Sequence, residues 1–175
     1  ADLLVLDGGA CRVGIESTIV DCTRGVPVLL RPGAITRTQI EAACGLRLLS
    51  KEELLAHTPR ASGTLLAHYA PSAPVRLMDA AALQAALDVR DNAAPTLAVY
   101  ARTALHSGAA HVVLHPMPTQ ADAAAAELFA QLRRFDDQGA GEIWIETPPT
   151  SPDWEGVRDR LQRAAAATAT THGAS

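Results

Sequence analysis

A serine and a threonine stand shortly after a glycine-rich stretch near the start of the chain: Ser17 and Thr18 follow Gly8, Gly9 and Gly14. Hydroxyl and backbone N–H groups at such a place can hold a phosphate or a carboxylate. The same pair can instead hydrogen-bond a turn, and the glycines can simply allow that turn. The stretch is neither a Walker A motif nor a Gly-x-Gly-x-x-Gly motif. Taken alone, these residues leave an anion-binding role and a structural role open.

Two arginines follow expected strands and are candidates for contact with an anionic ligand. Arg31 ends the apolar stretch 26–31, directly before a Pro-Gly turn pair, and Arg102 follows the expected strand 96–100. A guanidinium group suits bidentate contacts with phosphate or carboxylate, and the ends of parallel strands face the crevice where α/β sheets bind ligands. The alternatives are an ion pair for Arg31 and an ordinary loop position for Arg102.

Three histidines raise the question of a metal site. His106, His111 and His115 are spaced by five and four residues across an expected loop and strand, and no cysteine or carboxylate completes a ligand set. Structural zinc sites take four such ligands. We therefore expect no metal at these positions.

The composition predicts a soluble globular protein and argues against a nucleic-acid-binding surface. Of the 175 residues, 48% are hydrophobic, 19% charged and 3% aromatic, and the formal net charge is −4. The lack of aromatic stacking platforms and of a Lys/Arg stripe argues against a nucleic-acid surface. The cysteines, Cys11, Cys22 and Cys44, are odd in number and lack Cys-x-x-Cys spacing, which favours reduced thiols in the cytoplasm. No apolar run approaches the ~20 residues of a membrane span.

The elements that must position these residues begin with a first α/β unit, expected over residues 1–48. Its strands are expected at 3–6, 17–21 and 26–31; its helix is expected to be capped by Thr36, to run to about Cys44 and to stop at Gly45. About fifty residues with one helix cannot close a hydrophobic core alone. We therefore expect this unit to be the last part of a larger domain, and the chain to be the C-terminal piece of a larger protein.

Residues 49–74 are interpreted as an ordered linker, or strap. Prolines interrupt regular structure throughout it, yet it also contains apolar and aromatic residues, unlike a flexible linker. A long loop of this composition is functional or packed on something. Arg60, His68 and Tyr69 are its candidate ligand contacts. The alternative for His68 and Tyr69 is that they only hold the strap in place.

Residues 75–168 alternate strands and helices, which predicts a small Rossmann-like domain with a parallel sheet. The strands are expected at 75–78, 96–100, 111–114 and 142–146, and the helices at 80–89, at 120–138 and around Trp154, Val157 and Leu161. Residues 169–175 are expected to be a frayed tail. The predicted fold class is thus α/β throughout.

The motifs, taken in order, resemble those of the two-domain threonylcarbamoyl-AMP synthases. The block Glu16-Ser17-Thr18-Ile19-Val20-Asp21 is followed by Leu30-Arg31-Pro32-Gly33 and His68-Tyr69-Ala70-Pro71, and the stretches 144–146 and 159–165 are similar to the end of the family's chain. The resemblance covers nearly the whole chain. It implies that residues 1–48 are the C-terminal part of a YrdC-like catalytic domain, that 49–74 lie over its active site, and that 75–168 are a Rossmann-like accessory domain.

The family reaction joins L-threonine, bicarbonate and ATP into threonylcarbamoyl-AMP and pyrophosphate, for the threonylcarbamoyl modification of adenosine in tRNAs. The resemblance implies a cytoplasmic nucleotidyltransferase that uses ATP with Mg²⁺, holds no tightly bound cofactor or resident metal, and passes its product to tRNA-modification transferase proteins; direct tRNA binding stays open. The positions implied to contact ATP or threonine are Ile15, Ser17, Thr18, Arg31, Arg60, His68, Tyr69 and Arg102, with no catalytic acid or base among them.

The sequence departs from the family in one large respect. The long N-terminal part of the YrdC-like domain, with its basic phosphate-binding residues and Ser-x-Asn motif, is absent. Leu65 and Ala67 also stand where some relatives carry basic residues. The 175 residues are therefore expected to be inactive alone. The alternative function is a non-catalytic nucleotide- or RNA-binding module with a regulatory Rossmann-like domain.

Overall fold

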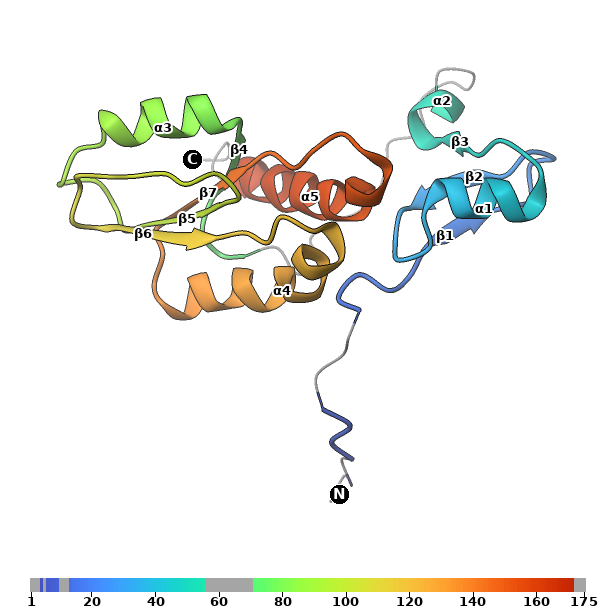
Figure 1. The fold of residues 1–175 in the computed structure, drawn as a ribbon, viewed down its shortest axis with the longest axis horizontal. Coiled ribbons are helices and arrows are strands. Elements are labelled where there is room, and N and C mark those ends of the chain that lie inside the picture. The colour runs from blue at the N-terminus through green and yellow to red at the C-terminus, as the bar shows by residue number, and fades with distance from the viewer. Residues whose placement is uncertain (1–3, 5, 10–12, 56–70, 172–175) are drawn as a thin grey trace.

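The computed structural model describes residues 4, 6–9, 13–55 and 71–171, which build a small N-terminal unit and a larger C-terminal domain (Figure 1). The N-terminal unit has a sheet of order β1-β2-β3. Strand β1 (Ile19–Asp21) runs antiparallel to β2 (Val28–Arg31), and β2 runs parallel to β3 (Leu49–Ser50). Helix α1 (Arg37–Cys44) connects β2 to β3, and α2 (Lys51–Leu55) follows β3 directly.

The ends of α1 are set by local sequence, as predicted. The Thr36 side chain accepts a hydrogen bond from the backbone N–H of Gln39, and the Gln39 side chain accepts one from the backbone N–H of Thr36. This capping box satisfies donors that have no partner inside the helix. At the other end Gly45 takes a left-handed conformation with φ of 70°, which glycine adopts without steric cost.

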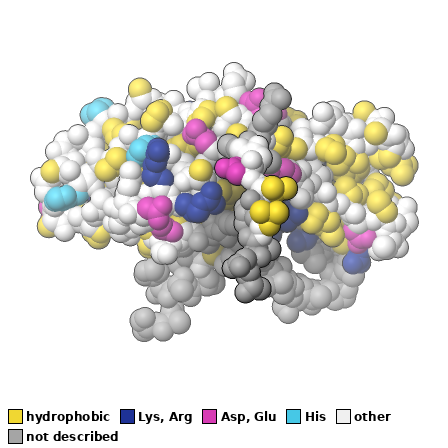
Figure 2. Space-filling model, turned by 90° about the horizontal axis from the view of Figure 1, so that it is seen from below, with side chains coloured by type: hydrophobic (Ala, Val, Ile, Leu, Met, Phe, Trp, Pro, Cys, Tyr) yellow, Lys and Arg dark blue, Asp and Glu magenta, His cyan; other side chains and the backbone are white. Residues whose placement is uncertain are grey.

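The N-terminal unit has a thin core. Among its described residues, the buried hydrophobic side chains are Ile15, Val28, Leu29 and Leu48, and α1 buries none. Large apolar side chains remain exposed at Ile19, Val26, Ile35 and Leu46, and hydrophobic side chains gather over this unit in the space-filling view (Figure 2). The sequence-based expectation that this unit cannot close a core alone agrees with this burial.

The C-terminal domain has a four-stranded sheet of order β4-β7-β5-β6, parallel throughout. The strands are β4 (Val75–Met78), β5 (Leu97–Ala101), β6 (Val112–Pro116) and β7 (Glu142–Glu146). The helices are α3 (Ala80–Asp88), α4 (Ala121–Asp137) and α5 (Glu155–Thr171), the last preceded by the short 3₁₀ helix η1 (Pro152–Trp154). The predicted parallel α/β sheet is thus confirmed.

Side chains that alternate along the strands enter two cores, one on each face of this sheet. Leu97 and Val99 pack with Leu83 and Leu87 of α3 on one face. Their neighbours Ala98 and Tyr100 pack with residues of α4 and α5 on the other. Figure 1 shows α3 and α4 on opposite sides of the sheet. Both faces are therefore covered, which explains why β5 is buried over its whole length.

The start of α5 joins the two parts of the molecule. Ile15, from the loop before β1, belongs to the same buried cluster as Trp154 and Val157. A Cβ atom placed on Gly156 would lie 3.5 Å from Cγ2 of Ile15 and 3.7 Å from the carbonyl oxygen of Gly33. The N-terminal unit therefore packs against the first turn of α5 through small residues.

The structure differs from the sequence-based expectation in four places. Leu4 and Leu6, in the expected strand 3–6, are not in a strand and are 84% and 86% exposed. The second expected strand starts at Ile19 and not at residue 17. The first residues of the supposed linker form β3 and α2. Helix α5 continues to Thr171, into the range expected to be frayed.

None of the helices in the described part of the chain has the length and apolar character that crossing a membrane requires.

Candidate functional site

Four of the candidate residues lie in one place, on the side of the N-terminal unit where β1 begins and β2 ends. Ile15, Ser17 and Thr18 lead into β1, and Ile19 pairs with Arg31 in the sheet register. A Cβ atom on Gly33 would overlap the backbone of Ser17 and Thr18. The turn after β2 is therefore stacked directly on the Ser-Thr segment, and only glycine fits there.

The two hydroxyl groups of this segment have different roles. The Thr18 hydroxyl donates a hydrogen bond of 2.8 Å to the carbonyl oxygen of Ile35, and the backbone N–H of Ala34 donates one of 3.3 Å to the carbonyl oxygen of Glu16. Both bonds hold the chain after β2 against the segment before β1. The Ser17 side chain is exposed, and its hydroxyl makes no hydrogen bond to another described residue. Ser17 is thus the member of the pair whose hydroxyl is available to a ligand.

Arg31 is half-buried at the end of β2. Its Nε atom is buried and has no hydrogen-bond partner among the described residues. A buried guanidinium N–H without a partner is unfavourable, because it has lost water without gaining another acceptor. The position therefore suits an anionic ligand that accepts this hydrogen bond.

Ile15 is oriented differently from what a ligand contact through its side chain requires. The side chain is 4% exposed and lies in the hydrophobic cluster shared with α4 and α5. A ligand could therefore contact Ile15 only through its backbone. The predicted contact of Ile15 with ATP or threonine stays a prediction.

Asp21, at the end of the same motif, stabilises a turn. Its carboxylate accepts hydrogen bonds from the hydroxyl and backbone N–H of Thr23 and from Nε of Arg24. The bonds from Thr23, and then the Arg24 guanidinium, lower the pKa of Asp21 to about 2. The group stays ionised near neutral pH and is unsuited to serve as a general acid or base there.

Arg102 lies apart from this cluster, at the carboxyl end of the parallel sheet. Its Nη2 atom donates to Glu146 at 2.5 Å and to the carbonyl oxygen of Thr147 at 3.0 Å, and its guanidinium carbon lies 5.5 Å from the ring centroid of Trp154. The backbone N–H groups of Arg102 and Thr103 also donate to Glu146, at 2.7 and 2.8 Å. Arg102 is therefore held by internal partners, and its contact with a nucleotide stays a prediction.

Glu146 is a residue that sequence reasoning missed. It is a charged residue that is buried, with 5% of its surface exposed. The available signal was its position, a carboxylate at the carboxyl end of an apolar strand, where α/β sheets place functional or structural polar groups. Its four donors come from the loop after β5, so it fixes that loop to β7.

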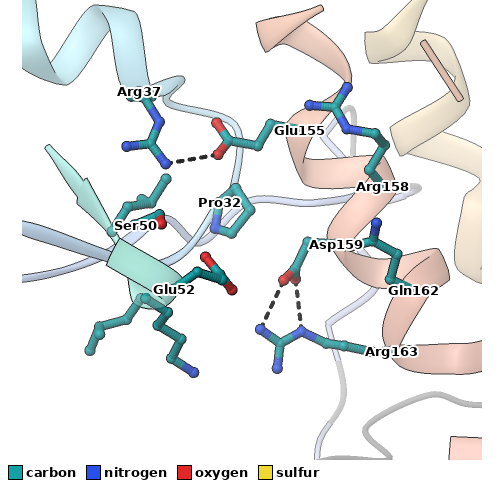
Figure 3. Close-up of a pocket in the computed structure, with 12 residues that line it drawn as sticks. Pro32, Arg37, Ser50, Glu52, Glu155, Arg158, Asp159, Gln162 and Arg163 are labelled. Carbon is teal, nitrogen blue, oxygen red and sulfur yellow. Dashed lines mark hydrogen bonds and ion pairs between the residues drawn. The ribbon is translucent and has the colours of Figure 1, made fainter. Parts of the chain in front are cut away.

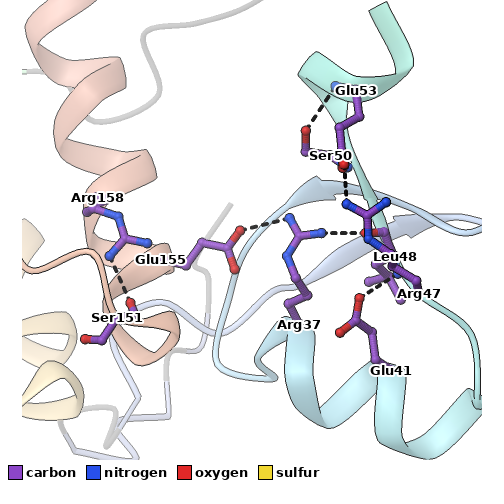
Figure 4. A network of polar contacts seen from close by, with 9 residues as sticks. All are labelled: Arg37, Glu41, Arg47, Leu48, Ser50, Glu53, Ser151, Glu155 and Arg158. Atoms are coloured by element: carbon purple, nitrogen blue, oxygen red, sulfur yellow. Dashed lines mark hydrogen bonds and ion pairs between the residues drawn. The ribbon is translucent and has the colours of Figure 1, made fainter. Parts of the chain in front are cut away.

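A polar cleft of about 290 Å³ lies between β2 and α5 (Figure 3). Pro32 and Arg37 come from the N-terminal unit, and Glu155, Asp159 and Arg163 come from α5. Arg37, at the start of α1, donates to Glu155 of α5 at 3.1 Å and to the carbonyl oxygen of Leu48, directly before β3, at 2.7 Å (Figure 4). The cleft is thus lined by charged groups from both parts of the molecule.

Arg60, His68 and Tyr69 lie outside the described residues, so their predicted contacts stay predictions. The histidines considered for a metal site are His106, His111 and His115, and within the described ranges no three His, Cys, Asp or Glu side chains are grouped to hold a metal ion. His115 packs edge-on against Phe135 with ring centroids 5.2 Å apart, which is a packing role.

Comparison with known proteins adds a chain-wide similarity to this geometry. The family model described as "Threonylcarbamoyl-AMP synthase, C-terminal domain" matches residues 35–166. The threonylcarbamoyl-AMP synthase of Bacillus subtilis is 30% identical over 170 residues, which cover 92% of this chain and 48% of the relative. That of Schizosaccharomyces pombe is 28% identical over 93% of this chain and 45% of the relative.

A solved structure shows the same similarity in three dimensions. The crystal structure of Pyrococcus abyssi Sua5 complexed with L-threonine superposes with a TM-score of 0.73 and 26% identity, over 93% of this chain and 49% of that one. The chain thus spans about half the length of the relatives that it matches over most of its own length.

Proposed function

The chain belongs to the family of the threonylcarbamoyl-AMP synthase C-terminal domain, and from this premise we propose that it serves the synthesis of threonylcarbamoyl-AMP from L-threonine, bicarbonate and ATP, with release of pyrophosphate. The observation that carries the proposal is the similarity to the Bacillus subtilis synthase over 92% of this chain. The cluster of Ser17, Thr18 and Arg31 supports it, because the Ser17 side chain is exposed and the buried Nε of Arg31 has no hydrogen-bond partner among the described residues.

The chemistry asks mainly for positioning and for stabilisation of phosphate charge. The neutral amine of threonine forms a C–N bond with the carbon of bicarbonate, whose C–O bond breaks so that the hydroxyl leaves as water with a proton from the nitrogen; with CO₂ the same carbamate forms and the proton goes to solvent. An oxygen of the resulting carbamate then attacks the α-phosphorus of ATP, and the bond to pyrophosphate breaks. Such a step depends on cations and aligned donors more than on an acid–base pair. In our proposal Arg31 stabilises phosphate charge, while Ser17 and the neighbouring backbone orient a substrate.

Magnesium fits this proposal as part of the substrate. Mg²⁺ is commonly held by one or two carboxylates together with substrate phosphates and water. The described residues offer no grouped set of three His, Cys, Asp or Glu side chains for a metal, so we propose that the ion arrives with ATP. We further propose that the product passes to tRNA-modification transferase proteins in the cytoplasm, where Cys22 and Cys44, both free and exposed, would stay reduced.

The test is release of pyrophosphate from Mg·ATP. It is measured with this chain alone and with this chain fused to the part of the Bacillus subtilis synthase that it does not match. We expect the fusion to release pyrophosphate only when both L-threonine and bicarbonate are present. Arg31→Gln in the fusion should lower the rate about tenfold or more, as loss of a charge-assisted hydrogen bond implies.

The control for this test is Arg134→Gln, which removes the same charge from an exposed position on α4. It should leave the rate unchanged. A folded fusion that binds ATP but releases no pyrophosphate would contradict the proposal. Such a result would favour the non-catalytic nucleotide- or RNA-binding module.

A further inference from the structure

A cavity of about 270 Å³ lies at the carboxyl ends of β5 and β6, and none of its residues belongs to the cluster of Ser17, Thr18 and Arg31. Its walls are the last residues of both strands and the segment 102–105, which follows β5. Leu114 of β6 is 39% exposed, so the cavity is open to solvent beside this edge strand. The apolar residues that line it are Val99, Ala101, Ala104, Leu105, Leu114 and Pro116.

The chain leaves these two strands toward opposite faces of the sheet. After β5, Leu105 packs against the hydrophobic cluster that includes residues of α3. After β6, Met117 is buried in the cluster formed with α4 and α5, and Figure 1 shows α3 and α4 on opposite sides of the sheet. In open α/β sheets, ligands bind in the crevice that forms where the connections of neighbouring strands diverge in this way. The cavity therefore lies where this type of fold places a ligand.

The neighbouring crevice, between β5 and β7, is filled by the protein itself. There Glu146, at the end of β7, accepts from the backbone N–H groups of Arg102 and Thr103 and from the guanidinium of Arg102. No carboxylate is found among the described residues that line the cavity between β5 and β6. This second crevice is therefore not filled by an internal ion pair.

The walls of the cavity are held in place without a ligand. The segment 102–111 connects β5 to β6 without a helix, and Glu146 fixes its first residues. Gln84 of α3 fixes its middle, because the side-chain amide donates to the carbonyl oxygen of His106 at 3.0 Å and accepts from the His106 N–H at 3.1 Å. A ligand that enters a cavity with fixed walls loses little affinity to the ordering of the protein.

The polar groups of the lining define which ligand suits the cavity. The hydroxyl and the backbone N–H of Thr103 both bind Glu146, and the ring of His115 packs against Phe135 of α4. Nε of Arg102 is buried and has no hydrogen-bond partner among the described residues. Because Glu146 already balances the charge of Arg102, this N–H suits a neutral acceptor better than an anion.

We propose that this cavity binds a small uncharged molecule with an apolar body, and that a carbonyl-type oxygen of this molecule accepts a hydrogen bond from Nε of Arg102. The apolar walls remove the body of the ligand from water. The volume lies below the range of about 300–1,000 Å³ that is typical for drug-sized ligands, so the ligand is smaller than these. The site requires neither ATP nor threonine, so its test is independent of the proposed reaction.

The experiment titrates the ¹⁵N-labelled chain with acetophenone and follows the backbone amide signals by NMR. We expect saturable shifts at Thr103, Ala104 and Leu114, with a Kd of about 1 mM, as for a ligand of few atoms. Ala104→Trp, at an exposed position that lines the cavity, should weaken binding about tenfold or more because the indole fills the space. The control Ala110→Trp, exposed in the same connection but outside the lining, should bind like the unaltered chain. No saturable shifts, or equal binding by Ala104→Trp, overturns the proposal.

The contact with Arg102 is tested by one variant and two probes. Arg102→Lys keeps a cation for Glu146 but has no nitrogen at the position of Nε. The second probe, α-methylstyrene, has the shape of acetophenone with a CH₂ group in place of the oxygen. We expect Arg102→Lys to weaken binding of acetophenone about fivefold, the effect of one lost hydrogen bond, and to leave binding of α-methylstyrene unchanged. A change in the shape of the cavity would affect both probes, so an equal loss for both contradicts the proposal.

Benzoate distinguishes an uncharged ligand from an anion. It has the size of acetophenone and carries a negative charge. We expect benzoate to bind more weakly than acetophenone, because Glu146 already neutralises Arg102 and the rest of the lining is largely apolar. Tighter binding of benzoate would overturn the proposed ligand class and assign the cavity to a carboxylate.

Discussion

Glu146 shows how one buried carboxylate organises the carboxyl end of the parallel sheet. It accepts from the backbone N–H groups of Arg102 and Thr103 and from both of their side chains. Replacement would leave the two backbone donors and the guanidinium of Arg102 without their acceptor. Because Arg102 also packs over Trp154 at the start of α5, the effect should extend to the contact between the sheet and that helix.

We predict that Glu146→Gln lowers the free energy of unfolding by about 3 kcal/mol, the usual cost of breaking a buried ion pair from one side. Urea denaturation measures the change as a lower midpoint with an unaltered slope. Asp137→Asn, at an exposed position near the end of α4, is the control and should stay within about 0.5 kcal/mol of the parent. If the two variants are equally stable, the bonds to Glu146 contribute little to stability.

The family resemblance implied one site for Ser17, Thr18 and Arg31, and the structure brings them close together, although their contact with a ligand stays a prediction; the sequence did not indicate the direction of their neighbour Ile15. The first three share one short β-hairpin, so local chain order already brings them together. The environment of Ile15 is set by Trp154 and Val157, which are far away in the sequence. A contact between residues so far apart in the sequence produces no hydrophobic periodicity in a short loop. The burial of Ile15 therefore cannot be predicted from the sequence around it.

At the scale of elements, local sequence patterns predict the ends of helices and the type of each element. The capping box of Thr36 and Gln39 fixed the start of α1, and the alternation of apolar strands and amphipathic helices predicted the parallel sheet. A second capping box begins α2: the hydroxyl of Ser50 accepts from the N–H of Glu53, and the Glu53 carboxylate accepts from the N–H of Ser50. The Ser-x-x-Glu pattern predicts this start of α2, which the prolines farther along obscured.

The order of the strands was beyond these local signals. Strand β7 lies between β4 and β5, so the last strand in the sequence is central in the sheet. Long-range packing decides this order, because the sequence of a single strand does not specify which strands lie beside it. The strand predicted at 3–6 was wrong for a related reason. An apolar composition does not provide a neighbouring strand to pair with, and Leu4 and Leu6 are exposed.

Two glycines on either side of the contact between the N-terminal unit and α5 should respond oppositely to alanine. A Cβ on Gly33 would overlap the backbone of Ser17 and Thr18, so Gly33→Ala should destabilise the chain by about 1–3 kcal/mol. A Cβ on Gly156 would meet Cγ2 of Ile15 at 3.5 Å, an ordinary contact, within a helix. Gly156→Ala should therefore be neutral or stabilise by up to about 1 kcal/mol.

Thermal and urea unfolding of both variants measure this difference in sign. Gly108→Ala is the control, because a Cβ there meets no atom within 4 Å. A neutral Gly33→Ala would mean that the turn after β2 can move away from the Ser-Thr segment. In that case the stacked arrangement would not be what positions Ser17.

At the scale of the whole molecule, the cleft between β2 and α5 couples the two parts through charge as well as packing. Ile15 and Gly156 supply apolar contact, and Arg37 and Glu155 supply an ion pair across the cleft. A ligand bound in this cleft would touch both parts at once, because its lining comes from β2, α1 and α5, so its binding should favour the docked arrangement over a separated one.

The coupling free energy between Arg37 and Glu155 measures how firmly the N-terminal unit docks on α5 when no ligand is bound. Nη2 and Oε1 are 3.1 Å apart, and both side chains are 25% exposed. A double-mutant cycle with Arg37→Ala and Glu155→Ala should give a coupling free energy of about 0.5 kcal/mol that decreases with added salt. The cycle is needed because Arg37 also donates to the carbonyl oxygen of Leu48 inside its own unit, and this contribution cancels in the cycle.

The control cycle pairs Glu155→Ala with Arg24→Ala, since Arg24 binds Asp21 within the N-terminal unit. Its two changes should be additive. Additivity in both cycles would mean that the N-terminal unit does not stay docked on α5 in solution. Coupling in the Arg37 cycle alone would show that the ion pair across the cleft contributes to docking of the N-terminal unit on α5.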